Sequence, residues 1–228
     1  MALTADDLEE FGGIAPLFPL PNFIMLPHVV QPFHMFEPRY RALTADAIAG
    51  DRFLAIAVFE PGWEEDYNGA PPLRPIACLA RILNHQQTAE GTYNLLIRGV
   101  CRARLGKELL ASTLYRQAEA TPLADPVVPT TATLRAELAA AADPWLPSGG
   151  PAQEQFLMLL ESNLSLGALV DVISFALPVP GERKQLLLET IDLHERYALL
   201  LETLRSGPEG RTPAPTGPRR YPPEFSNN

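Results

Sequence analysis

The stretch that decides the fold is residues 17–43, LFPLPNFIMLPHVVQPFHMFEPRYRAL. Its apolar residues are interrupted by Pro19, Pro21, Pro27, Pro32 and Pro38. Because proline fixes φ and has no backbone N–H to donate, it occurs at the starts, edges and bends of β-strands. The stretch therefore predicts short extended segments that turn corners, as strands do where a sheet closes into a small barrel.

A helix is predicted to follow directly and to begin at Pro38. Proline suits the first helical position, where its missing N–H costs nothing. Apolar residues then recur at helical spacing: Tyr40, Leu43, Ala47 and Ile48. Gly50 stands where such a helix would end. The stretch is thus interpreted as bent strands that run directly into a helix.

Several motifs resemble the N-terminal substrate-binding domain of Lon-type ATP-dependent proteases. They are Pro19-Leu20-Pro21, Leu26-Pro27, Phe36-Glu37-Pro38-Arg39-Tyr40-Arg41, Gly50-Asp51-Arg52, the region of Gly99, and Lys184-Gln185-Leu186-Leu187-Leu188-Glu189. The resemblance covers roughly residues 15–205, and it implies a PUA-like barrel in a stand-alone bacterial form of the domain. We interpret Phe36, Glu37, Pro38, Arg39 and Tyr40 as structural. In this interpretation Glu37 and Arg39 brace the turn and Tyr40 lies in the core.

Further strands are predicted from apolar runs and alternation at residues 53–59, 76–86 and 115–120. Glu90-Gly91 predicts the turn of a hairpin, and a return strand follows from residue 93. About six strands and one helix therefore predict a small mixed barrel.

The return strand carries a candidate binding face. Side chains alternate between the two faces of a strand, so six residues are predicted to share one face: Tyr93, Leu95, Ile97, Cys101, Ala103 and Leu105. Arg98, Arg102 and Arg104 take the other side, with Gly99 as a candidate bulge between them. This basic strip could hold an acidic peptide or a phosphate. The alternative is a solvated face whose arginines pair with nearby acids.

A second candidate site is the loop at residues 60–75, which is rich in glycine, proline and acids. Trp63 and Tyr67 lie within it and are predicted to be exposed anchors for a partner, because aromatic residues dominate binding hot spots. The alternative is that one of them folds back to cover the barrel.

The predicted domain organisation has five parts. They are a flexible leader at 1–14, a barrel at 15–122, a linker at 123–129, a helical bundle at 130–205, and a disordered Pro/Gly-rich tail at 206–228. In the bundle region Thr130 or Thr131, Ser165 and Asp192 are predicted helix caps. The fold class is therefore α+β, a PUA-like small mixed β-barrel followed by a C-terminal α-helical bundle.

The charge and cysteine content of the chain argue against some classes of binding partner and location. The chain has 228 residues, a formal net charge of −9, and only two lysines, Lys107 and Lys184. This balance argues against nucleic acid and anionic membrane surfaces, both of which attract clustered basic residues. Two cysteines and the lack of a signal sequence or membrane span predict a soluble cytoplasmic protein.

The sequence lacks recognisable catalytic motifs. Gly106-Lys107-Glu108 lacks the spacing and the Ser or Thr of a phosphate-binding loop. The histidines show no metal-ligand spacing, and Cys78 and Cys101 are expected to pack as small apolar residues. We therefore expect no cofactor, no metal and no enzymatic activity.

The resemblance implies a non-catalytic protein that binds exposed or unfolded polypeptide segments, as substrate recognition or an adaptor in protein quality control. A Lon-type protease is a possible partner. Two alternatives remain. One is an RNA-binding PUA-like protein, which the acidic charge disfavours, and the other is a small hydrolase with an unrecognised site.

Overall fold

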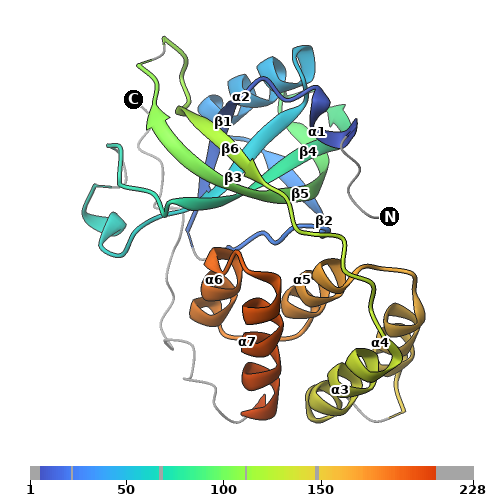
Figure 1. Ribbon diagram of the computed structural model, residues 1–228. Helices are drawn as coiled ribbons and strands as arrows, with labels where there is room; N and C mark the ends of the chain where they lie inside the picture. The colour runs from blue at the N-terminus through green and yellow to red at the C-terminus, as the bar shows by residue number, and fades with distance from the viewer. Residues whose placement is uncertain (1–5, 22, 67–68, 111, 147–148, 209–228) are drawn as a thin grey trace.

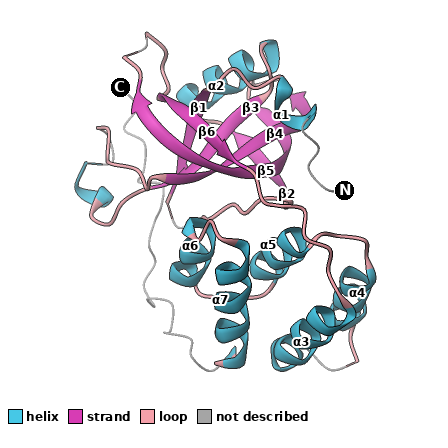
Figure 2. Cartoon of the chain, viewed as in Figure 1, coloured by secondary structure: helices cyan, strands magenta, loops and turns pink. Residues whose placement is uncertain are grey.

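The computed structural model describes residues 6–21, 23–66, 69–110, 112–146 and 149–208. The chain forms a mixed α+β structure, which confirms the predicted fold class at this level (Figures 1 and 2). The expected tail lies outside the described residues from 209 onward, as does the expected leader up to residue 5. Residues 6–9 of that leader form a short helix.

The described strands are β1 (Ile14–Leu20), β2 (Val30–Met35), β3 (Phe53–Val58), β4 (Ile76–Gln87), β5 (Tyr93–Glu108) and β6 (Gln117–Leu123). The helices among them are α1 (Asp6–Glu9), α2 (Pro38–Ala49) and the 3₁₀ turn η1 (Trp63–Asp66). The helices after them are α3 (Ala132–Ala142), the 3₁₀ turn η2 (Asp143–Trp145), α4 (Pro151–Glu161), α5 (Leu166–Ala176), α6 (Gly181–Glu189) and α7 (Leu193–Arg205).

The strands pair in the order β2-β5-β4-β3-β1-β6, and β6 pairs again with β5. Five strands are thus joined in a cycle, which is the connectivity that a small barrel requires. β1 and β3 are parallel and the other pairs are antiparallel. β2 pairs only with the first part of β5, and β6 takes the second part. The PUA-like assignment of this sheet stays a prediction.

An alanine-rich core is formed by side chains from all five strands of the cycle. Its buried members are Ala15, Leu17, Phe53, Ala55, Ala57, Ala77, Leu79, Val100, Cys101, Ala103, Ala118 and Ala120. Small side chains fill a narrow space at the density that protein interiors require. The opposite face of the sheet packs in a larger core with α2, where Tyr40 and Leu43 are buried. Tyr40 also donates its hydroxyl to the Pro19 carbonyl at 3.2 Å.

Gly99 marks a bulge in β5, as predicted. Leu79 pairs with Cys101 but Ala80 pairs with Gly99, so one residue of β5 is extra. A Cβ on Gly99 would lie 2.4 Å from the Leu26 carbonyl oxygen, so only glycine lets the two backbones approach this closely. Because side chains alternate along a strand, the extra residue moves every later side chain of β5 to the other face.

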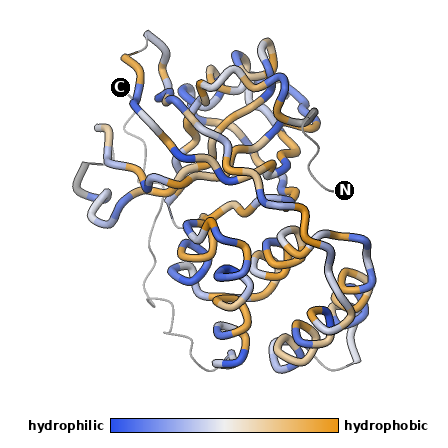
Figure 3. Tube along the Cα trace, in the orientation of Figure 1, coloured by the Kyte–Doolittle hydropathy of each residue, from blue (hydrophilic) through white to orange (hydrophobic). Residues whose placement is uncertain are grey.

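The helices α3–α7 lie together on one side of the sheet (Figure 1) and have an apolar core of their own. α5 is mostly hydrophobic along its length (Figure 3). Thr131, Ser165 and Asp192 accept hydrogen bonds from the first turns of α3, α5 and α7, which confirms these predicted caps. Within the described residues, no helix is long and apolar enough to cross a membrane.

Candidate functional site

Trp63 does not have the exposure that the sequence suggested. Its side chain is buried and stacks on Phe59, with 5.4 Å between the ring centroids and 21° between the planes. The 60–75 loop is tied back to the sheet because Glu60 N–H donates to the Pro72 carbonyl and Arg74 N–H to the Val58 carbonyl. The expectation of an exposed Trp63 anchor is therefore wrong, and the alternative of a residue folded over the sheet is what the structure shows. Tyr67 lies outside the described residues.

The three arginines of β5 do not form one strip. Arg98 precedes the bulge and lies opposite Arg81, whereas Arg102 follows the bulge and lies opposite Cys78. The extra residue puts Arg98 and Arg102 on opposite faces of the sheet, so the expectation of a shared face is wrong. Arg104 is exposed, Arg98 is half-buried and Arg102 is 1% exposed.

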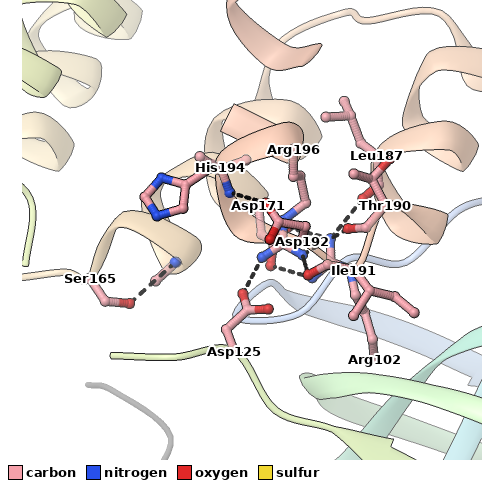
Figure 4. Close-up of polar contacts among 12 residues, drawn as sticks. Arg102, Asp125, Ser165, Asp171, Leu187, Thr190, Ile191, Asp192, His194 and Arg196 are labelled. Atoms are coloured by element: carbon pink, nitrogen blue, oxygen red, sulfur yellow. Dashed lines mark hydrogen bonds and ion pairs between the residues drawn. The ribbon is translucent and has the colours of Figure 1, made fainter. Parts of the chain in front are cut away.

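Arg102 joins the sheet to the C-terminal helices (Figure 4). Its Nη1 and Nη2 donate to the two carboxylate oxygens of Asp171 in α5, at 3.0 and 2.8 Å. Its Nε and Nη2 donate to the carbonyls of Leu188 and Leu187 at the end of α6. Burial is the largest single influence and lowers the pKa of Arg102, but the charge of Asp171, its hydrogen bonds and the charge of Asp125 together outweigh burial, so the pKa is raised. Arg102 is thus fully engaged inside the protein and is not a ligand-binding residue.

A second buried arginine extends this network. Arg196 of α7 pairs with Asp125, which lies in the segment between β6 and α3, and donates to the Thr190 carbonyl at 3.0 Å. Its Nε lies 3.7 Å from Asp171. A Cβ on Gly167 would meet the Asp125 carboxylate at 2.5 Å, so glycine allows the carboxylate to approach α5. Two arginines and two aspartates balance in charge, which is what burial requires.

An exposed, partly apolar face runs across β2, β5 and β4, and the strand register defines it in three rows. The first row contains Val30, Arg98 and Arg81, and its register continues on β3 to Phe53, which is buried. The second contains Pro32, Leu96 and Asn84, and the third contains His34, Asn94 and Gln86. We call these residues, together with Phe36 and Leu83 at their margin, the β2–β5–β4 face.

Several apolar side chains of this face are open to solvent. Val30 is 41% exposed, Leu96 39%, Phe36 47% and Leu83 42%. Single exposed apolar residues are ordinary, but Val30, Pro32 and Leu96 occupy adjacent register positions and form a patch of the kind that marks an interaction site.

The β2–β5–β4 face is stabilised by the core beneath its strands and by contacts between its own side chains. The other faces of the same strands pack into the larger core through Phe33, Met35, Leu95 and Ile97. His34 Nδ1 and Asn94 Oδ1 are 2.7 Å apart, and Phe36 stacks on His34 with 6.1 Å between ring centroids and 20° between planes. A rigid surface loses little conformational entropy when a ligand binds.

A signal for this face is present in the sequence, in the alternation along β2. Every second residue of this segment faces away from the core: Val30, Pro32, His34 and Phe36. Phe33 and Met35 between them face the core, so the segment carries apolar side chains on both sides. Glu37 and Arg39 were predicted to brace the turn before α2, and their side chains form an ion pair at 2.9 Å. Tyr40 was predicted to lie in the core, and it is buried. Phe36, in contrast, points to the surface and belongs to the exposed face.

Both cysteine side chains are buried. Burial raises the pKa of the Cys101 thiol to about 11 and also raises that of Cys78, so both remain protonated and unreactive at neutral pH. Both cysteines are free. Within the part of the chain that the structure describes, no three His, Cys, Asp or Glu side chains are grouped as a metal ion would need.

These features define a mixed α+β protein with a cyclic sheet and an open apolar face. Residues 14–206 match the family model described as the ATP-dependent protease La (LON) substrate-binding domain. The chain therefore belongs to the Lon substrate-binding domain family, as the motifs around Pro19 and Phe36 indicated.

The chain is similar to the N-terminal part of several Lon proteases. Over 202 residues it is 30% identical to Lon protease 2 of Myxococcus xanthus and 28% identical to Lon protease of Anaeromyxobacter dehalogenans. The match covers 86% of this chain but 24% and 23% of those proteins, so the chain spans about a quarter of their length.

Two solved structures share the fold. The N-terminal domain of Mycobacterium avium complex Lon protease aligns with a TM-score of 0.59 and 22% identity, covering 84% of this chain and 97% of that one. A Lon N-terminal domain protein from Xanthomonas campestris aligns with a TM-score of 0.59 and 21% identity, covering 83% and 97%. At these identities the likeness concerns the fold alone.

Proposed function

We propose that this chain binds exposed apolar segments of other polypeptides on the β2–β5–β4 face and performs no catalysis itself. The observation that carries the proposal is the solvent exposure of Val30, Leu96 and Phe36 on a rigid, well-packed sheet. Unfolded polypeptides differ from folded ones chiefly in exposing apolar side chains, so such a surface discriminates between the two states. Membership of a family named for substrate binding supports the same function.

Side chains, and not strand addition, are proposed to provide the contacts. β2 ends the strand order and would be the place for an added strand. However, Pro32 has no N–H to donate, and the Gln31 side-chain amide donates to the Val30 carbonyl at 2.8 Å. Both features obstruct backbone pairing at an edge. The ligand is therefore held by burial of its apolar side chains.

The partners and the setting are part of the proposal. The clients are unfolded or peptide-like segments, and a Lon-type protease is the proposed receiver, because the relatives of this chain are Lon proteases. Two free, buried cysteines support a reducing location such as the cytoplasm. Nothing in the described structure favours the RNA-binding or hydrolase alternatives over this function.

The test is a titration of a permanently unfolded protein, reduced and carboxymethylated α-lactalbumin, into wild type and into Phe36→Ser/Leu96→Ser. Loss of two anchors should weaken binding by about tenfold or more. The matched control is Leu157→Ser/Met158→Ser on α4, which removes two exposed apolar side chains far from the sheet (Figure 1). Equal weakening in both variants, or none in the first, would contradict the proposed site.

A further inference from the structure

The N-terminal segment of the chain lies on the same side of the sheet as the exposed apolar residues. Leu8 and Phe11 pack against the alanine-rich core. The Phe11 ring meets the Phe53 ring edge-on, with 5.3 Å between centroids and 60° between planes. Glu10 forms an ion pair with Arg81, and Gly12 N–H donates to Asp51 Oδ2 at 3.4 Å.

The contacts of this segment fall in the first row of the β2–β5–β4 face. Phe53 pairs in register with Arg81, Arg81 with Arg98, and Arg98 with Val30. The segment thus covers the β3 end of a row whose other end is exposed Val30. The exposed residues of the second row, Pro32 and Leu96, follow directly. The intramolecular contact and the open patch are therefore one continuous surface.

The face presents an aromatic ring and a positive charge together where the segment docks. The Arg81 guanidinium lies over the Phe53 ring, 5.4 Å from its centroid. The segment meets this pair with an acid followed by an aromatic residue, Glu10-Phe11. Arg81 provides the positive charge that Glu10 meets, so charge complementarity favours an acidic ligand at this end of the row.

The segment is held only at a few points. The Glu10 side chain is 60% exposed, Phe11 is half-buried, and α1 has only four residues. Helices this short are not stable alone, so the segment owes its place to the packing of Leu8 and Phe11, to the Glu10–Arg81 ion pair, and to the backbone hydrogen bonds at Gly12 and Gly13. Segments with so little buried apolar surface open at a low free-energy cost.

We propose that Glu10 and Phe11 act as a built-in competitor that occupies one end of the ligand-binding face. The ligands that fit the face are polypeptide segments in which an acidic residue adjoins an aromatic or large apolar one. This inference rests on the proposed function and names its ligand class and its regulation.

The experiment uses a fluorescein-labelled peptide that copies residues 6–13, DDLEEFGG, and a second peptide with lysine in place of both glutamates. Each is titrated into the full chain as wild type and as the opened variant Glu10→Gln/Phe11→Ser. The matched control is Glu9→Gln, an exposed acid on the same segment. Because a tethered segment competes at an effective concentration in the millimolar range, opening should tighten binding of the acidic peptide by about tenfold or more.

The lysine peptide should show no such gain, and Glu9→Gln should bind both peptides as wild type does. Equal affinity of wild type and opened variant for the acidic peptide overturns the inference, and so does equal gain for the lysine peptide. If the opened variant does not fold, hydrogen–deuterium exchange of wild type answers the question. Saturating acidic peptide should then accelerate exchange at residues 8–13, and unchanged exchange overturns the inference.

The unfolded-protein titration separates this inference from the proposed function. Binding of carboxymethylated α-lactalbumin that is equal in wild type and opened variant rejects the competitor while the proposed function stands. If the opened variant binds the acidic peptide more tightly than wild type but neither protein binds unfolded α-lactalbumin, the proposed function is rejected. The competition by Glu10 and Phe11 for the face still stands in that case.

Discussion

Arg102 and Asp171, from β5 and α5, form a bidentate ion pair in which both side chains are only 1% exposed. The pair joins the sheet to the C-terminal helices and is surrounded by the carbonyls of Leu187 and Leu188. A buried charge is tolerated only while its partner is present, so each residue of the pair depends on the other.

Asp171→Ala should therefore destabilise the protein strongly. The substitution leaves Arg102 buried without its carboxylate and removes the nearby charge from Arg196, which should cost about 3–5 kcal/mol in the free energy of unfolding. Urea denaturation measures this directly. Glu108→Gln is the control, because its ion pair with Arg116 is partly exposed and should contribute less than about 1 kcal/mol. Comparable losses in the two variants would show that burial does not determine the cost.

Gly99→Ala should be poorly tolerated although it adds only one methyl group. The new Cβ would lie 2.4 Å from the Leu26 carbonyl oxygen and 3.0 Å from Cys78 Sγ, so β5 or the 26–29 segment must shift. Overpacking of this kind costs about 1–3 kcal/mol. Gly12→Ala, where nothing lies within 4 Å, is the matched control in thermal unfolding. A melting temperature equal to that of wild type would mean that the bulge adjusts freely.

Stability should fall as the pH drops below 6.5, and His28 should account for part of the fall. Burial lowers the pKa of His28 from its ordinary value of 6.5, so the unfolded chain binds a proton that the folded chain resists. His28 therefore favours folding fully above that pH, and this contribution is lost as the pH decreases toward the lowered pKa.

His28→Asn should flatten this dependence between about pH 7.5 and 5.5, because asparagine does not titrate. His28 has a φ of 67°, a region that asparagine also adopts readily, so the replacement adds little strain. Urea denaturation at several pH values provides the comparison. Parallel pH profiles for wild type and variant would exclude His28 as the titrating group.

The purified chain should neither hydrolyse ATP nor cleave casein. The sequence has no phosphate-binding loop, and the cysteine thiols have raised pKa values that keep them protonated. Release of phosphate and of acid-soluble peptides measures the two activities. Turnover that persists through repurification and disappears with a single substitution would establish a catalytic site.

Features that depend on a few neighbouring residues were predictable from the sequence. The caps Thr131, Ser165 and Asp192 bond to amides two or three residues away, so their signature is local. The helix start at Pro38 is local for the same reason. Gly99 pointed to the bulge in the sequence, although the close approach that requires glycine there comes from the distant Leu26 carbonyl. Motifs spread along the chain indicated the family, which the match over residues 14–206 established.

The sequence by itself thus determined the elements, their caps and the family, while only the tertiary structure decided which side chains reach the surface. Arg102 is buried because Asp171, 69 residues away, approaches it, and Trp63 is buried because its loop returns onto Phe59. Val30 and Leu96 look like core residues in the sequence but are exposed where β2 meets β5. Burial depends on contacts between distant segments, and alternation along one strand says only that two faces differ.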